Sequence, residues 1–223
     1  MDKKFSLVLL DFDGPLCDLF AGYPARTIAE KVAHVARDIL KVPLSRLADP
    51  DPMQVLIKAS RFGTTEATLV AIDKALRDAE IAATDSAVAT SGACDLVRWL
   101  ANEHVSWGVV TNNSREAVER FFAMQGWPTP HVSGRDAGRP MLMKPRPEPL
   151  NRLILSLGHS ASRTCFLGDS VADIEAAIAC GATPIGFANK AGKSEKLRAA
   201  GATSLFCDLR EFLAWLKGHS SGA

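Results

Sequence analysis

The sequence predicts an α/β fold: a three-layer sandwich in which helices cover both faces of a central parallel sheet, with an α-helical subdomain inserted into it. Two observations predict this fold. Short apolar runs alternate along the chain with segments whose apolar residues follow helical spacing, which is typical of parallel sheets. A stretch of about 70 residues, from Leu19 to Ala89, breaks this alternation and contains only helical patterns.

Six segments are predicted to be strands. The first is the nearly continuous apolar run from Phe5 to Leu10, which ends at carboxylates and is typical of a strand buried on both faces. The other five are similar short runs: Val105 to Val110, His131 to Ser133, Thr164 to Leu167, Thr183 to Phe187 and Ser204 to Phe206. The run from His131 to Ser133 gives the weakest signal.

The segments between the later strands are predicted to be helices, because their apolar residues recur every three or four positions. On the helix from Val171 to Cys180, for example, the predicted buried face consists of Ile174, Ala177 and Ile178. The remaining predicted helices are Gly92 to Asn102, Ser114 to Gln125, Pro147 to Leu157, Lys193 to Ala200 and Leu209 to Lys217.

Residues 19–89 are predicted to form a helical subdomain inserted after the first strand, so that residues 1–18 and 90–223 together make the core. The Asp-Pro-Asp-Pro sequence at 49–52 predicts a turn between helices of this subdomain. Two sets of apolar residues at helical spacing mark its helices: Ile28, Val32, Val35, Ile39 and Leu40, then Leu69, Ile72, Leu76 and Ala79.

The composition excludes several classes of function. The chain carries 26 Lys plus Arg against 25 Asp plus Glu, so its formal net charge is +1. A balance this even lacks the positive excess that attracts nucleic acid or an anionic membrane, and we expect neither as a partner. No apolar run approaches the roughly 18 residues that a membrane-spanning helix needs. The five cysteines are odd in number and scattered, which predicts reduced thiols and a cytoplasmic location.

Two carboxylates follow the first predicted strand, in Asp11-Phe12-Asp13-Gly14. Residues two apart on an extended chain share a side, and the carboxyl edge of a parallel sheet is where α/β proteins bind ligands. Neighbouring carboxylates repel each other, so the pair indicates either a Mg²⁺ site or a division of acid and base roles. The alternative is that an Asp caps a turn for which Gly14 provides the bend.

A second acidic motif, Gly168-Asp169-Ser170-Val171-Ala172-Asp173, follows the strand from Thr164. Asp169 ends this strand and Asp173 falls in the first turn of the next helix, so both can face one crevice. Helix capping alone would explain Ser170 and Asp173, because a serine N-cap and an acidic residue in the first turn both stabilise a helix. It does not explain Asp169.

Two further segments carry polar residues suited to binding phosphate. In Thr111-Asn112-Asn113-Ser114, a strand runs into small polar residues and then a helix, where a hydroxyl and backbone amides can cradle a phosphate. These residue types are also common helix caps. Lys144 lies between an apolar run and two prolines, which predicts a stiff loop, although an isolated surface lysine is the ordinary alternative.

The four motifs in this order resemble those of the haloacid dehalogenase-like hydrolase superfamily, in the phosphatase branch with a helical cap between motifs one and two, which includes phosphoglycolate phosphatase-like enzymes. The likeness covers essentially the whole chain and implies a Rossmann-like core. One departure is Pro15, where Thr or Val is more usual in the family; proline fixes φ and removes an amide donor, which bears on how the cap hinges.

The resemblance also implies a role for each residue. Asp11 matches the nucleophile that becomes an aspartyl phosphate, and Asp13 matches the general acid and base. Thr111, with Asn112 beside it, matches the phosphate-binding position, and Lys144 matches the cation that offsets negative charge. Mg²⁺ would be held by the carboxylates of Asp11 and Asp169 and by the backbone carbonyl of Asp13, with Asp173 in support.

The sequence therefore predicts a Mg²⁺-dependent phosphatase that acts on a small phosphorylated metabolite. Because Asp13 is present in phosphatases and phosphomutases of this superfamily and absent from its dehalogenases, dehalogenation is not expected. Two alternatives stay open: a phosphomutase of the same fold, which no residue here separates from a phosphatase, and a non-catalytic phosphoacceptor. The physiological substrate and the oligomeric state are not determined by these motifs.

Overall fold

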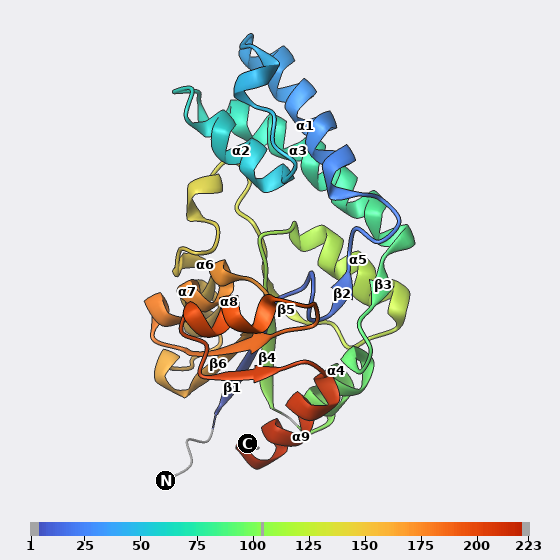
Figure 1. The fold of residues 1–223 in the computed structure, drawn as a ribbon, viewed down its shortest axis with the longest axis vertical. Coiled ribbons are helices and arrows are strands. Elements are labelled where there is room, and N and C mark those ends of the chain that lie inside the picture. Colours follow the sequence, from blue (N-terminus) through green and yellow to red (C-terminus); the bar gives the residue numbers. More distant parts are fainter. Residues whose placement is uncertain (1–4, 104, 220–223) are drawn as a thin grey trace.

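Six parallel strands form the central sheet of the computed structural model, which describes residues 5–103 and 105–219 (Figure 1). Their spatial order is β5-β4-β1-β6-β7-β8. All six predicted strands are present: β1 (Leu7–Leu10), β4 (Ser106–Val110), β5 (His131–Ser133), β6 (Thr164–Gly168), β7 (Thr183–Phe187) and β8 (Ser204–Phe206). The predicted α/β class is therefore confirmed.

The register of the central strands positions the site. β1 lies between β4 and β6, with Leu7 opposite both Ser106 and Thr164. All four residues of β1 are buried, as expected for an interior strand of a parallel sheet. Because the three strands run in the same direction and in register, the residues that follow them meet at one edge of the sheet.

Helices cover both faces of this sheet. Alternate residues of β1 point to opposite faces: Val8 and Leu10 pack with α4, α5 and α9, whereas Leu7 and Leu9 pack with α6 and α7. This arrangement is the predicted three-layer sandwich. The helices are α4 (Ala93–Asn102), α5 (Arg115–Gln125), α6 (Glu148–Ser156), α7 (Val171–Cys180), α8 (Lys193–Ala199) and α9 (Leu209–His219).

One predicted buried position on α7 is wrong. Ile174 and Ala177 are buried, but the side chain of Ile178 is 50% exposed. The buried face of α7 also includes Asp173 and Ala176, so it is centred nearer the site, and the helix turns Ile178 toward solvent.

The segment after β1 forms three helices that lie beyond the carboxyl edge of the sheet (Figure 1). They are α1 (Ala25–Leu40), α2 (Pro52–Ser60) and α3 (Glu66–Ala83), and they pack on one another. The predicted apolar faces are largely buried, but Ile39 is exposed in the last turn of α1. The spacing of apolar residues did not predict α2. This helix begins at the predicted Asp-Pro turn, and the Asp51 side chain caps it by accepting the Met53 N–H at 2.8 Å.

A short antiparallel ribbon joins the helical segment to the sheet, and it corrects the expectation that residues 19–89 contain no strand. β3 (Val88–Ala89) pairs with β2 (Cys17–Asp18), residues about 70 positions apart in the chain. Only this pairing defines the strands, since two residues are too few to show a hydrophobic period. The boundaries 1–18, 19–89 and 90–223 remain a prediction, and residues 1–4 and 220–223 lie outside the described residues.

All five cysteines are free thiols, two of them buried, one exposed and two in between. Within residues 5–103 and 105–219, no helix combines the length and the apolar character needed to cross a membrane.

Candidate active site

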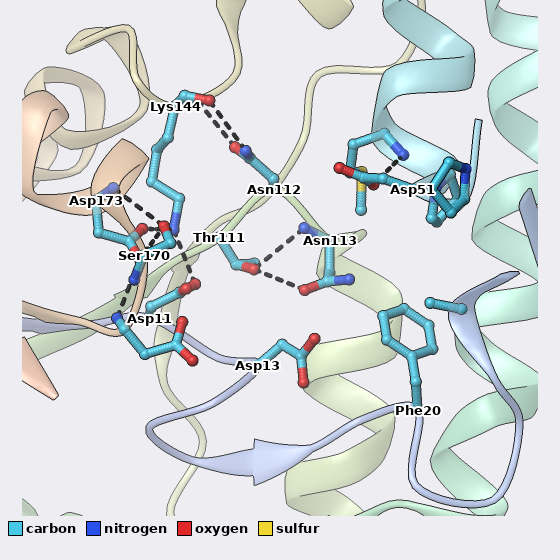
Figure 2. A pocket seen from close by; sticks show the side chains of 15 residues that line it. Asp11, Asp13, Phe20, Asp51, Thr111, Asn112, Asn113, Lys144, Ser170 and Asp173 are labelled. Atoms are coloured by element: carbon cyan, nitrogen blue, oxygen red, sulfur yellow. Dashed lines mark hydrogen bonds and ion pairs between the residues drawn. The ribbon is translucent and has the colours of Figure 1, made fainter. Parts of the chain in front are cut away.

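A cavity of about 390 Å³ lies between the carboxyl edge of the sheet and the helical segment (Figure 2). Its wall includes all seven residues that the sequence singled out: Asp11, Asp13, Thr111, Asn112, Lys144, Asp169 and Asp173. They come from different segments, after β1, after β4, from the loop before α6, after β6 and from α7. The tertiary fold thus brings together residues that are up to 162 positions apart.

The helical segment supplies the opposite wall, which the sequence analysis did not identify. It consists mainly of apolar side chains, with one carboxylate: Phe20, Ala25, Pro50, Asp51, Pro52 and Met53. No motif marks these residues, because which of them reach the cavity depends on how the helices pack. Two basic residues of this segment instead form ion pairs outside the cavity wall, Arg26 with Glu30 and Lys58 with Asp49.

Lys144 links two of the carboxylates. Its buried Nζ lies 2.8 Å from Asp11 Oδ1 and 2.6 Å from Asp173 Oδ1, and it donates to the Val110 carbonyl at 3.0 Å. Burial acts to lower the pKa of Lys144, but the charges of Asp11 and Asp173 outweigh burial and raise it. Lys144 is therefore held as a cation beside Asp11.

The carboxylates outnumber this cation. Burial raises the pKa of Asp11 well above its usual range, the charges of Asp173 and Asp169 raise it further, and Lys144 opposes the shift. Asp11 Oδ1 also accepts the Phe12 N–H at 2.8 Å. Three carboxylates, those of Asp11, Asp169 and Asp173, lie close together, and Lys144 is in direct contact with only two of them, so full ionisation of the group requires further positive charge.

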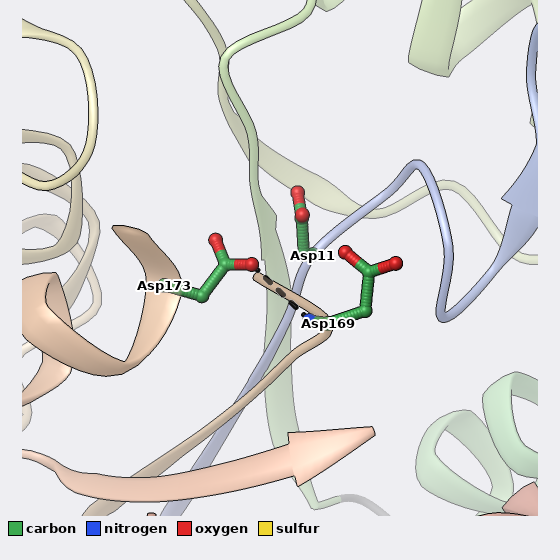
Figure 3. A group of neighbouring side chains, drawn as sticks. All are labelled: Asp11, Asp169 and Asp173. Atoms are coloured by element: carbon green, nitrogen blue, oxygen red, sulfur yellow. Dashed lines mark hydrogen bonds between the residues drawn. The ribbon is translucent and has the colours of Figure 1, made fainter. Parts of the chain in front are cut away.

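Asp11, Asp169 and Asp173 fit a divalent cation (Figure 3). One oxygen from each carboxylate can be chosen so that all three lie within 4.8 Å of one another. Oxygen donors of this kind are the ligands that Mg²⁺ prefers. Gly14 leaves room for the group, because a Cβ at that position would lie 2.2 Å from Asp169 Oδ2.

Asp13 stands apart from this group of three. Its Oδ1 accepts the Leu19 N–H at 2.9 Å. Burial raises its pKa to about 6, with the Leu19 hydrogen bond opposing the shift and the charge of Asp169 adding to it. A carboxyl group that titrates near neutrality can both donate and accept a proton. The contribution expected of its backbone carbonyl to a metal site stays a prediction.

Asp173 combines a structural and a site role. Its Oδ2 accepts the N–H groups of Asp169 at 3.1 Å and Ser170 at 3.0 Å and the Ser170 hydroxyl at 2.6 Å. The Asp173 N–H in turn donates to Ser170 Oγ at 3.3 Å, which completes a capping box at the start of α7. The helix-capping interpretation is thus confirmed. Asp173 Oδ1 is buried without a hydrogen bond and faces Lys144 as an ion pair, so one oxygen caps the helix and the other serves the site.

Lys193, at the start of α8, is a site neighbour that the sequence analysis missed. Its Nζ forms an ion pair with Asp169 Oδ2. Burial raises the pKa of Asp169, and the hydrogen bond and charge of Lys193 oppose that shift. Lys193 lies in a helix that follows none of the four motifs, so nothing in the sequence marked it as a site residue.

The loop after β4 is held by hydrogen bonds among its own side chains. The buried Thr111 hydroxyl donates to Asn113 Oδ1 at 3.0 Å and accepts the Asn113 N–H at 3.1 Å. Ser114 caps α5. The side-chain amide of Asn112 is bound to the backbone of Lys144, so a contact between Asn112 and phosphate stays a prediction.

Comparison with known proteins identifies the family. Residues 5–181, which include the seven predicted site residues, match the family model described as haloacid dehalogenase-like hydrolase. The chain belongs to this family. The resemblance drawn from the four motifs is therefore confirmed.

The relatives of this haloacid dehalogenase-like hydrolase include phosphoglycolate phosphatase from Synechococcus elongatus, which is 33% identical over 86 residues. That stretch covers 39% of each protein, about two fifths of the relative's length. A hydrolase from Pseudomonas syringae shares the fold, with a TM-score of 0.69, 19% identity and coverage of 99% of this chain and 100% of that one. CbbY from Rhodobacter sphaeroides, solved in complex with phosphate, also shares the fold. Its TM-score is 0.67 and its sequence identity 20%, and the match covers 96% of this chain and 99% of that one.

Proposed function

We propose that this haloacid dehalogenase-like hydrolase is a Mg²⁺-dependent phosphatase that hydrolyses a small phosphate monoester through an aspartyl phosphate on Asp11. The observation that carries the proposal is the placement of Asp11 at the cavity wall, with Lys144 Nζ at 2.8 Å and two further carboxylates close by. Such a site combines a nucleophile with the means to offset its negative charge.

The chemistry that bound Mg²⁺ supplies is positive charge, which lets a carboxylate approach an anionic phosphate. The carboxylates of Asp11 and Asp169 and the backbone carbonyl of Asp13 are the groups that would hold it, with Asp173, which lies beside them and pairs with Lys144, in support. Lys144 adds a fixed positive charge to the same region. The Asn113 N–H holds the Thr111 hydroxyl oxygen in place, and the hydroxyl proton, which is donated to Asn113 Oδ1 in this structure, would turn to a phosphoryl oxygen when phosphate binds.

In the first step, a carboxylate oxygen of Asp11 attacks phosphorus and the bond from phosphorus to the leaving oxygen breaks. Asp13 donates its proton to that oxygen, and the alcohol departs. In the second step, water attacks the same phosphorus and gives a proton to Asp13, while the bond from phosphorus to Asp11 breaks. Inorganic phosphate leaves, and both aspartates return to their starting states.

The substrate is proposed to be a small phosphorylated metabolite. Helices α1–α3 act as a cap: their inner wall, with Phe20 and Met53, lines a cavity of about 390 Å³ that is open to solvent in this structure, and closing of the cap over the bound substrate would exclude bulk water. The phosphoglycolate phosphatase name of one relative and the phosphate bound to CbbY support a substrate of this class. The free thiols support a cytoplasmic location, and the even charge balance supports neither nucleic acid nor membrane as a partner.

Phosphate release from an aryl phosphate, with and without Mg²⁺, tests the proposal on wild type and Asp11→Asn. We expect the wild type to depend on Mg²⁺ and Asp11→Asn to lose at least roughly 10³-fold in kcat, because no other nucleophile replaces it. Asp38→Asn, an exposed aspartate on α1, is the matched control and should keep the wild-type rate. Equal rates for wild type and Asp11→Asn would contradict the mechanism.

The phosphomutase alternative differs in where the phosphoryl group goes. A mutase returns it from Asp11 to a sugar, whereas a phosphatase transfers it to water. Incubation with a bisphosphorylated sugar separates the two: release of inorganic phosphate supports the phosphatase, and isomerisation without release supports the mutase.

A further inference from the structure

A buried group of charges connects the helical segment to the core. Arg135, in the loop after β5, lies against Asp73 and Glu80 of α3, and the side chains of these three residues are 1%, 6% and 0% exposed. Arg135 Nε donates to Asp73 Oδ1, Nη1 donates to Glu80 Oε1 at 2.8 Å, and Nη2 donates to Glu80 Oε2 at 3.1 Å. Buried charges are costly unless their hydrogen bonds are satisfied, and here Arg135 and Glu80 each have several partners, while Asp73 is paired with Arg135.

Arg135 and Glu80 also contact the loop that carries Thr111. Arg135 Nη1 donates to the Asn112 carbonyl at 2.7 Å, and the Arg135 N–H donates to the Asn113 carbonyl at 2.9 Å. Glu80 accepts Asn113 Nδ2 at 3.2 Å and the Ser114 N–H at 3.0 Å. Every residue from Asn112 to Ser114 is therefore held by this group of charges.

Two further contacts extend the connection into the cavity. Arg135 Nη1 lies 3.6 Å from the sulfur of Met53, which lines the wall contributed by α2. On the other side, the Asn112 side chain binds both backbone polar groups of Lys144. A continuous chain of contacts thus runs from α2 and α3 through Arg135 and Asn112 to the lysine beside Asp11.

The geometry requires arginine. Its planar guanidinium carries five donors in a fixed fork, and here donors from one side chain reach two carboxylates and a carbonyl at once. An ammonium group is compact and cannot reach all three partners with the same geometry. The group as a whole carries one positive and two negative charges, and Glu80 lies at the N-terminus of α5, where negative charge is favoured.

We propose that Arg135 is a positioning residue that couples the seating of the helical cap on the core to the placement of Thr111 and Lys144 around Asp11. This inference rests on the proposed phosphatase function of the site. With α3 seated, Arg135 fixes the Asn112 carbonyl, and Asn112 in turn fixes Lys144. Without the Arg135 guanidinium, Glu80 still binds Asn113 and Ser114, but the Asn112 carbonyl loses its link to α3, and Asn112 and Lys144 are held less firmly.

Arg135→Lys tests the coupling, with Arg120→Lys as the matched control. Arg120 also bridges the core and the helical segment, through Thr84 and Asp85, but it does not contact the loop from Thr111 to Ser114. Both variants are assayed on an aryl phosphate at a temperature where thermal melts show them folded. We expect kcat of Arg135→Lys to fall about 10- to 100-fold with KM changed far less, because misplaced catalytic groups cost rate at saturating substrate. Arg120→Lys should keep the wild-type kcat.

A second measurement does not depend on activity. Amide hydrogen exchange of residues 111–114 should be faster in Arg135→Lys than in wild type and unchanged in Arg120→Lys. If Arg135→Lys does not fold, the double variant Arg135→Lys/Asp73→Asn replaces it, because it relieves one buried negative charge. Unchanged kcat and unchanged exchange in a folded Arg135 variant would overturn the inference. Failure of the wild type to release phosphate would instead refute the proposed function, and the exchange data would still decide whether Arg135 orders the loop.

Discussion

The side chain of Asn112 holds the backbone of Lys144 on both of its polar groups. Asn112 Nδ2 donates to the Lys144 carbonyl at 3.1 Å, and the Lys144 N–H donates to Asn112 Oδ1 at 2.9 Å (Figure 2). The two residues are 32 positions apart, and the pair of hydrogen bonds fixes the loop from which Lys144 Nζ reaches Asp11 Oδ1. Asn112 therefore places the cation of the site without carrying charge itself.

Asn112→Ala is expected to lower kcat by about tenfold or more, because it removes both hydrogen bonds and lets the Lys144 loop shift. Mg²⁺ affinity, measured by calorimetry, should stay near the wild-type value, since Asn112 is not among the carboxylates of the cation site. Asn151→Ala, on the exposed side of α6, serves as the control. A variant with wild-type kcat would show that the Lys144 loop holds its position without Asn112.

Gly14→Ala is expected to weaken Mg²⁺ binding by at least about tenfold. The backbone at Gly14 has φ of 106°, and a Cβ there would lie 2.2 Å from Asp169 Oδ2, so the carboxylate must move. Gly63→Ala is the matched control: it also has a positive φ, of 65°, but no atom lies within 4 Å of its added Cβ. Calorimetric titration with Mg²⁺ measures both. Equal affinities for the two variants would exclude Asp169 as a ligand.

Lys193→Met is expected to raise Mg²⁺ affinity by roughly three- to tenfold. Lys193 pairs with Asp169, so its ammonium competes with a cation for the same carboxylate and repels the incoming charge. The pair is partly exposed, which limits the effect. Lys196→Met, on the exposed side of the same helix, should leave the affinity unchanged. Lower affinity in Lys193→Met would mean that the lysine supports the cation site instead of competing for it.

The apolar cap wall predicts a preference among leaving groups. Among the described residues that line the cavity, Lys144 is the basic one, and the cap side presents Phe20, Met53 and the carboxylate of Asp51. Phenyl phosphate should therefore have a higher kcat/KM than 4-carboxyphenyl phosphate, whose added charge gains no partner and faces Asp51. Asp51→Asn should bring the kcat/KM values of the two esters closer together, because asparagine keeps the N-cap of α2 while removing the negative charge. Faster hydrolysis of the carboxylated ester would contradict this view of the cap.

The elements of the core and the motif residues could be predicted because their signals are local. Burial of β1 and β6 on both faces requires continuous apolar runs, and Asp11 and Asp169 stand where those runs end. Parallel strands in register then bring those ends together, whatever the details of the helices. The family followed from the same four motifs.

Other features escaped the sequence because they join segments far apart in the chain. The strand β3 exists only through its pairing with β2, and no local pattern marks two residues. The lining of the cap, with Phe20 and Met53, depends on how α1–α3 sit over the sheet edge. The position of Ile178 on the exposed side of α7 depends on how that helix turns to present Asp173.

By itself the sequence determined the order of the strands and helices of the core, the acidic strand ends and the family, since periodicity and motif spacing are properties of the chain. The tertiary structure alone decided which groups contact Lys144, and it alone placed Arg135 between two carboxylates of α3 and the carbonyl of Asn112. The physical reason is that a hydrogen bond or a buried ion pair depends on distances of a few ångströms between side chains, and those distances exist only once the helical segment has packed against the core.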